Sequence, residues 1–463
     1  MELISQIQSA FLQTLERIEG FFDGKMDFGE LVSQLQQESN RLMCELTRTV
    51  LEEKDRQIRE ERFRRKDWVV ERRNDRHTLL VPYGEVCYQR TYYQHKPTAQ
   101  YAYLSDIACG IATHERIHST LSAGLVEQTC HRSYRKSGRQ YPEALVSGQA
   151  VLNHVRDLRL ISKDNAPDKK KVVEYLFVEA DEDHVPGQKG IASFESKLVY
   201  IHEGWNKVGK QRFSLKNARY FGGVYQNCEQ LWQEVWEYLD ANYDLGKVER
   251  IFVSGDGANW IGLGVDYLPK AVFVADRYHI AKYLVSVCFG DQELLSQLKK
   301  AVWASDRSRT MTLLKYAASL AITPQQRQKV LDCRKYLSRI WHGIAAYQQY
   351  EQVKGCSAEG HVSHVLSARL SSRPGAWSKC GANQITKLRL LYFNGESIKE
   401  SVLKQYRRGL EPLDLGSDFI RKASQQWNTK TNAVLQERLG NIPVLNSNVY
   451  GLRRAIMELK NLA

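Results

Sequence analysis

The segment RIFVSGDGANWI, residues 250–261, places Asp256 between two glycines at the end of an apolar run. The run is typical of a buried strand, and the glycines permit tight or left-handed backbone and let another group come close. An ordinary Gly-Asp-Gly turn with no further role has the same pattern. The elements on either side of the segment are needed to separate the two interpretations.

Strand-like and helix-like runs surround this segment in a definite order. We predict strands over 174–185, 196–205 and 219–225, a helix over 227–243, a strand over 250–256, a short helix, a strand over 271–276 and a further helix. This is the order of the ribonuclease H-like fold, a mixed sheet whose first three strands are antiparallel and whose later strands follow helical crossovers. The fold class is therefore α/β, with a ribonuclease H-like catalytic domain over 172–290 and 351–400.

In such a sheet the first and fourth strands lie side by side at the centre. Asp181, in VEADEDHV, and Asp256 would then project from neighbouring strand ends toward one point. Carboxylates that meet there suit Mg²⁺, with Mn²⁺ as a substitute, and the glycines beside Asp256 would admit a phosphodiester backbone. Glu179, Asp181 and Asp183 share one face of an alternating strand, so periodicity alone does not choose among them.

A two-metal site needs a third acid, which we expect from a helix beyond the last strand. In GCSAEGHVSHVLSARLSSRP, residues 355–374, Ser357 is placed to cap a helix, Glu359 lies in its first turn, and apolar residues follow at helical spacing. Glu351 and Glu396 lie in the same part of the chain, and a first-turn acid also simply favours the helix dipole. We choose Glu359, because its small neighbours leave room for DNA.

Three further regions flank or interrupt this domain. The separation of Asp256 from Glu359 is too long for a loop, and residues 291–350 have helical periodicity, so we predict a helical insertion there. Residues 1–65 predict an amphipathic helical arm for packing or dimer formation. A helical region over 401–463 is expected at the C-terminal end.

Residues 66–165 predict a small β element followed by a helix-turn-helix-like DNA-binding region. The β element breaks at a Pro-Tyr-Gly sequence, and the second helix begins after Ser147 as its N-cap. A plain helical hairpin has the same pattern, and solvated helix faces resemble a DNA-binding surface. The side chains that we expect to contact DNA are Arg132, Arg135, Lys136, Arg139, Gln149, Asn153, His154, Arg156 and, beyond the Glu359 helix, Trp377.

Composition agrees with a globular, nucleic-acid-binding protein. The chain has 463 residues, 43% of them hydrophobic, and 66 Lys and Arg against 53 Asp and Glu give a net charge of +13, which favours an anionic partner. Nucleic acid is the leading candidate, ahead of an acidic membrane surface. No run approaches the length of a membrane span, no secretion signal is present, and nine cysteines lack any C-x-x-C pair. We expect a cytoplasmic protein with reduced thiols.

Four segments together resemble a known family. VEADEDHV (178–185), VSGDGANWI (253–261), VADRYHIAKYL (274–284) and the segment from Gly355 to Arg389 are similar to the signature segments of the ISLre family of insertion-sequence transposases, which are DDE enzymes of the ribonuclease H-like superfamily. The resemblance extends over nearly the whole chain. The residues before Trp377 differ from the Met-Gly of the family, a change that touches no metal ligand.

The resemblance implies a DNA transposase with Asp181, Asp256 and Glu359 as its metal-binding catalytic triad. Two Mg²⁺ ions would serve strand cleavage by water and then attack of the freed 3′-hydroxyl on target DNA. Asp276 and His279 match an Asp-x-x-His segment of related transposases and would be auxiliary residues, although a lone helical histidine is as often a packing residue.

The implied partners are double-stranded DNA, as element ends and as target, and further copies of the chain, at least on DNA. No membrane is implied, and we expect the protein in the prokaryotic cytoplasm, associated with the nucleoid when bound to DNA. Two alternatives stay open. One is a metal-dependent nuclease or resolvase of the same fold, and the other is a non-catalytic DNA-binding relative of transposases.

Overall fold

The structure is a computed structural model that describes residues 9, 11–14, 16–18, 21–60, 67–159, 167, 169–210 and 212–407. The chain divides into two compact units: an N-terminal unit of Met1–Gln128, Ser133–His154 and Lys399–Ala463, and a sheet unit of Thr129–Arg132 and Val155–Ile398. Most of the predicted C-terminal helical region lies outside the described residues. None of the described helices is both long and apolar enough to cross a membrane.

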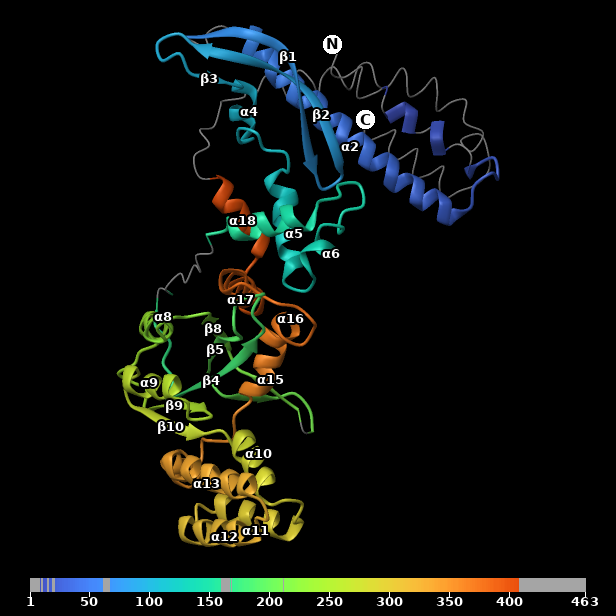
Figure 1. The fold of residues 1–463 in the computed structure, drawn as a ribbon. Helices are drawn as coiled ribbons and strands as arrows, with labels where there is room; N and C mark the ends of the chain where they lie inside the picture. Colours follow the sequence, from blue (N-terminus) through green and yellow to red (C-terminus); the bar gives the residue numbers. More distant parts are fainter. Residues whose placement is uncertain are drawn as a thin grey trace. The chain divides into compact units, whose positions relative to one another are not determined.

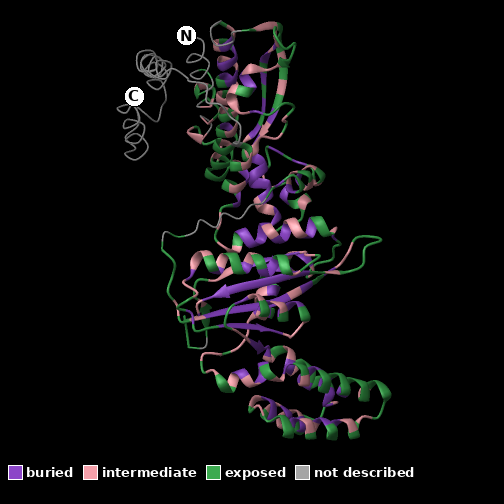
Figure 2. Cartoon of the chain, turned by 90° about the vertical axis from the view of Figure 1, so that its left-hand side faces the viewer, coloured by how far each residue is buried: buried purple, intermediate pink, exposed green. Residues whose placement is uncertain are grey.

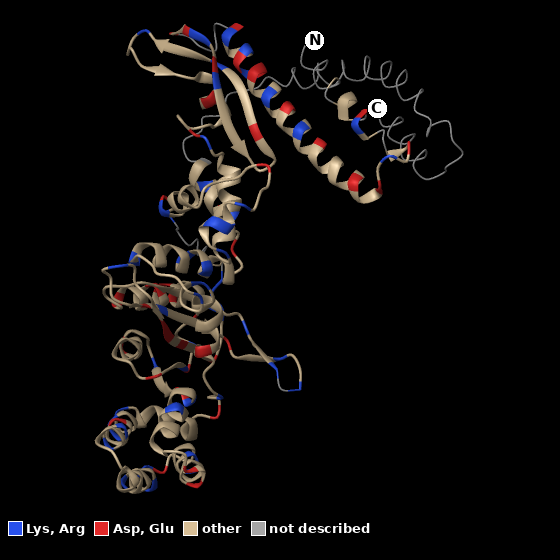
Figure 3. Cartoon of the chain, turned by 45° about the vertical axis from the view of Figure 1, so that its right-hand side comes forward, with Lys and Arg blue, Asp and Glu red and all other residues tan. Residues whose placement is uncertain are grey.

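The N-terminal unit contains a long helix packed on a β-hairpin (Figure 1). The helix is α2 (Phe28–Glu60), and the strands are β1 (Trp68–Val81), β2 (Gly84–His95) and the short β3 (Tyr101–Ala102). The buried carboxylate of Asp55 on α2 accepts hydrogen bonds from the backbone N–H and the hydroxyl of Thr91 on β2, at 2.9 and 2.6 Å. Charges of both signs run along the helix (Figure 3). The predicted amphipathic helix therefore packs on the predicted hairpin.

Short helices complete this unit, and one of them begins where the sequence predicts. They are α4 (Leu104–Cys109), α5 (Ser119–Thr129), α6 (Tyr134–Ser137), α7 (Gly148–Arg156) and α18 (Ile398–Arg407). The Ser147 hydroxyl accepts a hydrogen bond from the backbone N–H of Ala150 at 3.1 Å, which confirms the predicted N-cap. Leu121, Leu125 and Val151 form the core between α5 and α7.

The sheet unit is mixed α/β and is built on five strands in the order β10-β9-β4-β5-β8. The strands are β4 (Tyr175–Val185), β5 (Phe194–His202), β8 (Arg219–Gly223), β9 (Arg250–Gly255) and β10 (Ala271–Ala275). β4, β5 and β8 are antiparallel, whereas β9 and β10 run parallel to β4. The strands are buried along most of their length (Figure 2), because helices and loops cover both faces. β4 and β9 are direct neighbours, as predicted.

A helix follows each of β8, β9 and β10, and a small hairpin lies between β5 and β8. The helices are α8 (Glu229–Asn242), α9 (Asn259–Tyr267) and α10 (Arg277–Val287), and the hairpin consists of β6 (Trp205–Lys207) and β7 (Phe213–Leu215). The sequence predicts the three helices. It does not predict the hairpin, whose first strand was merged with the end of β5.

The segment predicted as a helical insertion consists of four helices, namely α11 (Gln292–Trp303), α12 (Arg307–Leu320), α13 (Pro324–Arg339) and α14 (Trp341–Gln349). Their beginnings are set by local chemistry. Asp291 and Asp306 cap α11 and α12, and Thr323 forms a capping box with Gln326 at α13. α14 packs closely on β10, because a Cβ at Gly343 would lie 2.4 Å from the Phe273 ring.

After the insertion, one helical run lies along β4. It consists of α15 (Ala358–Val362), the π-helix η2 (Ser363–Ser367) and α16 (Ala368–Leu370), and α17 (Lys379–Phe393) follows it. Val362, Val365 and Leu366 are buried, as the helical spacing predicts.

Glu179 of β4 fastens the start of this run. Its buried carboxylate accepts hydrogen bonds from the Ser357 backbone N–H at 2.6 Å, from the Ser357 hydroxyl at 3.0 Å, from His202 Nε2 at 3.1 Å and from the Tyr200 hydroxyl. The prediction that the Ser357 side chain caps the helix is therefore wrong. Its hydroxyl donates to the buried carboxylate of Glu179 and accepts no hydrogen bond from the first turn of α15.

Asp183 of β4 fastens the end of the run. Its carboxylate accepts hydrogen bonds from the hydroxyls of Ser367, at 2.9 Å, and Ser371, at 2.7 Å. The two outer acids on this face of β4 are thus occupied by the helical run. Asp181, which lies between them, has neither of these partners.

The glycines beside Asp256 serve protein packing. A Cβ at Gly255 would lie 2.7 Å from Ile261 Cδ1 and 2.9 Å from the carbonyl oxygen of Ala180. Gly257 has a φ of +85°, and a Cβ there would lie 2.5 Å from Ile340 Cγ2. The expectation that these glycines leave room for a phosphodiester is therefore corrected, because the space belongs to neighbouring side chains and backbone.

Two glycines of α9 give a matched test of this packing. Gly264→Ala should lower the free energy of unfolding by about 1–3 kcal/mol, because its Cβ would lie 2.4 Å from the Trp232 ring. Gly262→Ala should leave it unchanged or raise it by up to about 1 kcal/mol, because nothing lies within 4 Å and alanine favours helix. Urea unfolding followed by tryptophan fluorescence measures both, and equal effects would contradict the packing.

A second prediction concerns Glu179 and pH. Burial opposes its charged form, but the hydrogen bond and charge of His202 and the other donors outweigh burial and hold the pKa of Glu179 below its ordinary value of 4.5. A lowered folded pKa adds stability above the unfolded value, and this stability is lost as pH falls through the folded value. Glu179→Gln should therefore cost about 1–3 kcal/mol of unfolding free energy at pH 7.

The measurement is urea unfolding from pH 7 downward. The difference between wild type and Glu179→Gln should shrink once the pH drops below 4.5. Glu237→Gln, an exposed acid on α8, serves as the control and should change little at any pH. A difference that stays constant with pH would show that the Glu179 charge is not what the donors stabilise.

Candidate metal centre

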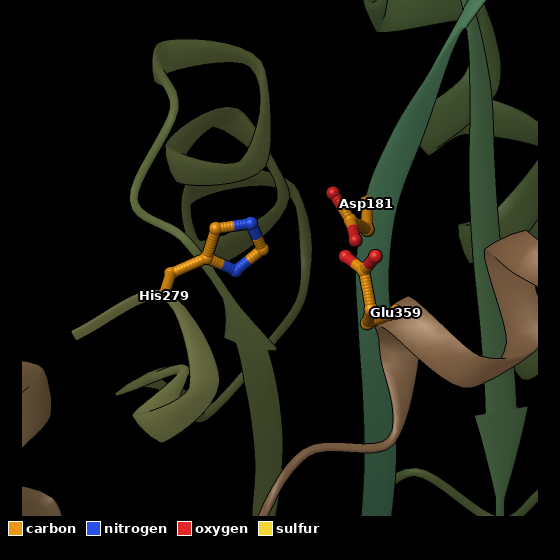
Figure 4. A group of neighbouring side chains, drawn as sticks. All are labelled: Asp181, His279 and Glu359. Atoms are coloured by element: carbon orange, nitrogen blue, oxygen red, sulfur yellow. The ribbon is translucent and has the colours of Figure 1, made fainter. Parts of the chain in front are cut away.

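Three side chains from three separate elements meet beside β4. Asp181 comes from the strand, His279 from α10 and Glu359 from the first turn of α15, and each offers a ligand atom within 4.8 Å of those of the other two. Figure 4 shows the carboxylates of Asp181 and Glu359 facing each other, with the His279 ring across from them. Asp181 is buried whereas Glu359 is exposed, so the group opens to solvent on the helix side.

The surroundings of Asp181 disfavour the ionised form of its carboxyl group. Burial raises the pKa of its carboxyl to about 6, and the charges of Glu182 and Glu359 act in the same direction. The backbone N–H of Glu182, which donates to Asp181 at 2.9 Å, and His279 oppose this rise. A cation at this point would stabilise the ionised carboxylate that the protein alone stabilises poorly.

His279 is oriented by Asp276, at the junction of β10 and α10. Asp276 is buried and accepts a hydrogen bond from the Tyr278 backbone N–H at 2.9 Å, which caps α10. Its other oxygen lies 2.8 Å from His279 Nδ1. This hydrogen bond is the main reason why the pKa of His279 is raised. Burial opposes the rise, while the charges of Asp276, Asp181 and Asp256 add to it.

Asp256 lies at the end of the neighbouring strand but outside the group of three. β4 and β9 pair in parallel up to Glu179 and Ser254, and the same register carried forward sets Asp256 opposite Asp181. Its carboxylate accepts a hydrogen bond from the Ala258 backbone N–H at 2.8 Å. The structure thus brings Asp181 and Glu359 together with His279, and leaves Asp256 nearby at the adjacent strand end.

The competing acids have other partners. Glu179 and Asp183 are bound to the serines of the helical run, and Glu396 pairs with Arg219 at 2.8 Å. Glu351 belongs to neither of the possible metal-ligand groups in the described ranges. These contacts favour Asp181 and Glu359 among the acids that the sequence leaves open.

The second such group lies on the other face of β4 and already contains a cation. It consists of Glu182 and His184 of β4 and Glu195 of β5. The ammonium of Lys197 pairs with Glu195 and lies 3.4 Å from Glu182, which also accepts a hydrogen bond from Trp260 Nε1 at 2.6 Å. Because the Lys197 ammonium pairs with both acids, we interpret this group as a salt-bridge network.

The side chains expected to contact DNA differ in their exposure. Trp377 is buried at 9% exposure, and its Nε1 donates to the Leu370 carbonyl at 3.0 Å, so it packs within the sheet unit and does not present its ring to a base. His154 is half-buried and lies 3.2 Å from the Ser122 hydroxyl. The remaining residues of the set are exposed, namely Arg132, Arg135, Lys136, Arg139, Gln149, Asn153 and Arg156.

The sequence predicts only an auxiliary role for His279, whereas the structure places its ring in the same group as Asp181 and Glu359. The Asp-x-x-His spacing at the start of a helix, which is visible in the sequence, puts an N-cap carboxylate beside this histidine. The sequence does not predict that Glu179 and Asp183 bind serines of the helical run. Their serine partners lie far along the chain, so no local signal identifies them.

Comparison with known proteins identifies relatives over the full chain. A UPF0236 protein of Caldanaerobacter subterraneus subsp. tengcongensis, whose name joins eleven locus designations, is 35% identical over 459 residues, 98% of this chain and 97% of the relative. Another from the same organism, whose name joins four locus designations, is 35% identical over 459 residues, with the same coverage of both chains. The "UPF0236 protein in vanSb 3'region" of Streptococcus gallolyticus is 24% identical over 346 residues, 71% of this chain and 75% of the relative.

A sequence profile leads to the same group. The profile of the family described as "Uncharacterised protein family (UPF0236)" matches residues 21–407, which include the sheet unit, most described residues of the N-terminal unit and every residue of the candidate metal centre. With this match and the full-length relatives, the chain belongs to the UPF0236 family.

Proposed function

We propose that the protein is a DDE transposase of the ribonuclease H-like superfamily, similar to the ISLre insertion-sequence transposases that its sequence resembles. It would cut DNA at the ends of an insertion sequence and join the freed 3′-hydroxyl to target DNA. The observation that carries the proposal is the meeting of Asp181 and Glu359, one from the central strand and one from a helix beyond a four-helix insertion.

The sheet supports the ribonuclease H-like assignment. Three antiparallel strands followed by two parallel strands, with the first strand at the centre, match the arrangement expected of that fold. Asp181 lies on the central strand β4 and Asp256 directly follows its parallel neighbour β9, where such a domain would hold its metal.

The donor set suits a divalent cation. Asp181 and Glu359 offer carboxylate oxygens, the ligands that Mg²⁺ and Mn²⁺ prefer, and Asp256 would complete a site for a second ion. Bound ions would stabilise the attacking and leaving oxygens of an in-line displacement at a phosphodiester. Buried Asp181 would fix one side of the site, and exposed Glu359 would leave the other side accessible to DNA.

The names of the relatives support the proposal that this protein is encoded by a mobile element. Eleven locus designations for one protein, and four for another, indicate many copies of a gene in one genome. Repeated copying of an insertion sequence produces this pattern, whereas a housekeeping enzyme seldom does.

Charge and exposure support DNA as the partner. The net charge is +13, and Gln149, Asn153 and Arg156 are exposed on α7 at spacings that place them on one helix face. Arg135, Lys136 and Arg139 are exposed on or next to α6. These side chains would contact the phosphates and base edges of the element ends. Assembly of several copies on DNA is part of the proposal.

The catalytic proposal is tested by charge-removing variants of the full-length protein. Asp181→Asn, Asp256→Asn and Glu359→Gln should each reduce strand cleavage and strand transfer in Mg²⁺ or Mn²⁺ by at least about 100-fold, because both steps use the same ions. Glu351→Gln, an exposed acid eight residues before Glu359, should stay active. Gel assays with element-end duplexes, intact and pre-cleaved, measure both steps.

The same assay separates the alternatives. Cleavage by the wild type without any joined product would indicate a nuclease or resolvase. DNA binding without cleavage in Mn²⁺ would indicate a non-catalytic relative. Joining of a pre-cleaved end by Glu359→Gln, but not by Glu351→Gln, would assign the third acid to Glu351, in the turn after α14.

DNA binding gives an independent prediction. Affinity for duplex DNA should fall steeply with salt, because each neutralised phosphate releases counterions. Replacing Arg132, Arg135, Lys136 and Arg139 together by alanine should reduce the slope of log affinity against log salt by up to about 3.6. Fluorescence anisotropy at several salt concentrations measures this, with Asp181→Asn as a control that binds like the wild type. An unchanged slope would remove the α6 region from the interface.

A further inference from the structure

We propose that His279 is itself a metal ligand, which makes the centre a mixed nitrogen and oxygen site that prefers a first-row transition metal such as Mn²⁺ over Mg²⁺. This inference rests on the proposed metal-dependent function and specifies its ion. Imidazole is a ligand that transition metals accept far better than Mg²⁺ does, whereas carboxylates serve both.

Proximity is the first argument. The group of described side chains that meets around Asp181 contains His279 and Glu359, and Asp256 is not a member. Figure 4 shows the His279 ring on α10 facing the two carboxylates across the space between them. The His279 ring is therefore placed to be a third ligand, across from the Asp181 and Glu359 carboxylates.

Orientation is the second argument. Asp276 holds Nδ1 of His279 at 2.8 Å, which leaves Nε2 as the nitrogen available to an ion. Asp276 is itself fixed, because it is buried and its backbone N–H donates to the Gly255 carbonyl at the end of β9, at 2.8 Å. A buried carboxylate behind a histidine is the arrangement that fixes the tautomer and raises the basicity of metal-bound imidazoles.

A second histidine offers a matched comparison. His361 lies on α15, two residues after Glu359, but its Nδ1 lies 2.9 Å from the Tyr220 hydroxyl and its ring packs on Tyr200 with centroids 4.4 Å apart. It therefore faces the core of the sheet unit and not the metal centre. Replacing it tests whether any nearby imidazole would give the same signal.

The experiment is pulsed electron paramagnetic resonance of Mn²⁺ bound to the full-length protein without DNA. Electron spin echo modulation from ¹⁴N should be present in the wild type, absent in His279→Gln and retained in His361→Gln. Labelling the wild type with ¹⁵N-histidine should remove the ¹⁴N modulation, a result that needs no variant and so stands even if His279→Gln folds poorly.

Affinity provides the second readout. Titration calorimetry should show Mn²⁺ affinity lower by about 10–100-fold in Asp276→Asn, which keeps a helix-capping side chain but loses the charge behind the imidazole. Mg²⁺ affinity should change by less than about threefold, because Mg²⁺ draws little from nitrogen donors. Equal losses for both ions would contradict a nitrogen ligand.

The outcomes separate this inference from the proposed function. Mn²⁺ that binds in a manner dependent on Asp181, but shows no ¹⁴N modulation, would overturn ligation by His279 and leave the carboxylate centre intact. Mn²⁺ binding that is absent, or unaffected by Asp181→Asn, would overturn the metal centre and the proposed function with it.

Discussion

The attachment of one helical run to the central strand determines the geometry of the whole centre. Glu179 and Asp183, two residues to either side of Asp181, accept hydrogen bonds from Ser357, Ser367 and Ser371. These bonds fix the run at both of its ends against β4. Glu359, in the first turn of the run, then lies beside Asp181, the acid between the outer pair. Burying a polar group is costly unless it is hydrogen-bonded, and here the helical run supplies donors to both carboxyl groups, although Oδ2 of Asp183 has no hydrogen-bond partner.

The sheet provides the other half of the geometry. β4 is central, and its parallel pairing with β9 brings the ends of two strands to the same edge. The next strand, β10, ends at Ala275, and the backbone N–H of the following residue, Asp276, donates to the Gly255 carbonyl of β9. Asp181, Asp256 and Asp276 therefore follow or lie on three adjacent strands, and their positions are set by the register of the sheet more than by any contact among themselves.

The sequence predicts most of this arrangement but not its details. The positions of the strands follow from apolar runs, because burial on both faces leaves a strong compositional signal, and the pairing of β4 with β9 follows from the order of strands and helices along the chain. Periodicity does not show which of Glu179, Asp181 and Asp183 is the metal ligand, because all three share one face of the strand. The sequence predicts a side-chain cap at Ser357 and open space at Gly257, and both predictions are wrong because the partners of these residues, Glu179 and Ile340, are distant in the chain. Trp377 lies among basic residues in the sequence, as a DNA-contacting tryptophan would, but its side chain is buried. Whether such a tryptophan is buried or exposed depends on tertiary contacts that the sequence does not reveal.

The four-helix segment from α11 to α14 connects the two helices that carry His279 and Glu359. The chain enters it from α10, which carries His279, and leaves it toward α15, which carries Glu359 (Figure 1). Both groups that reach Asp181 from outside the sheet are thus tethered to the two ends of one body. Each end is also hydrogen-bonded to the sheet, because Ser357 donates to Glu179 of β4 and the backbone N–H of Asp276 donates to the Gly255 carbonyl of β9. The four helices can therefore differ in length or sequence without displacing His279 or Glu359 from Asp181.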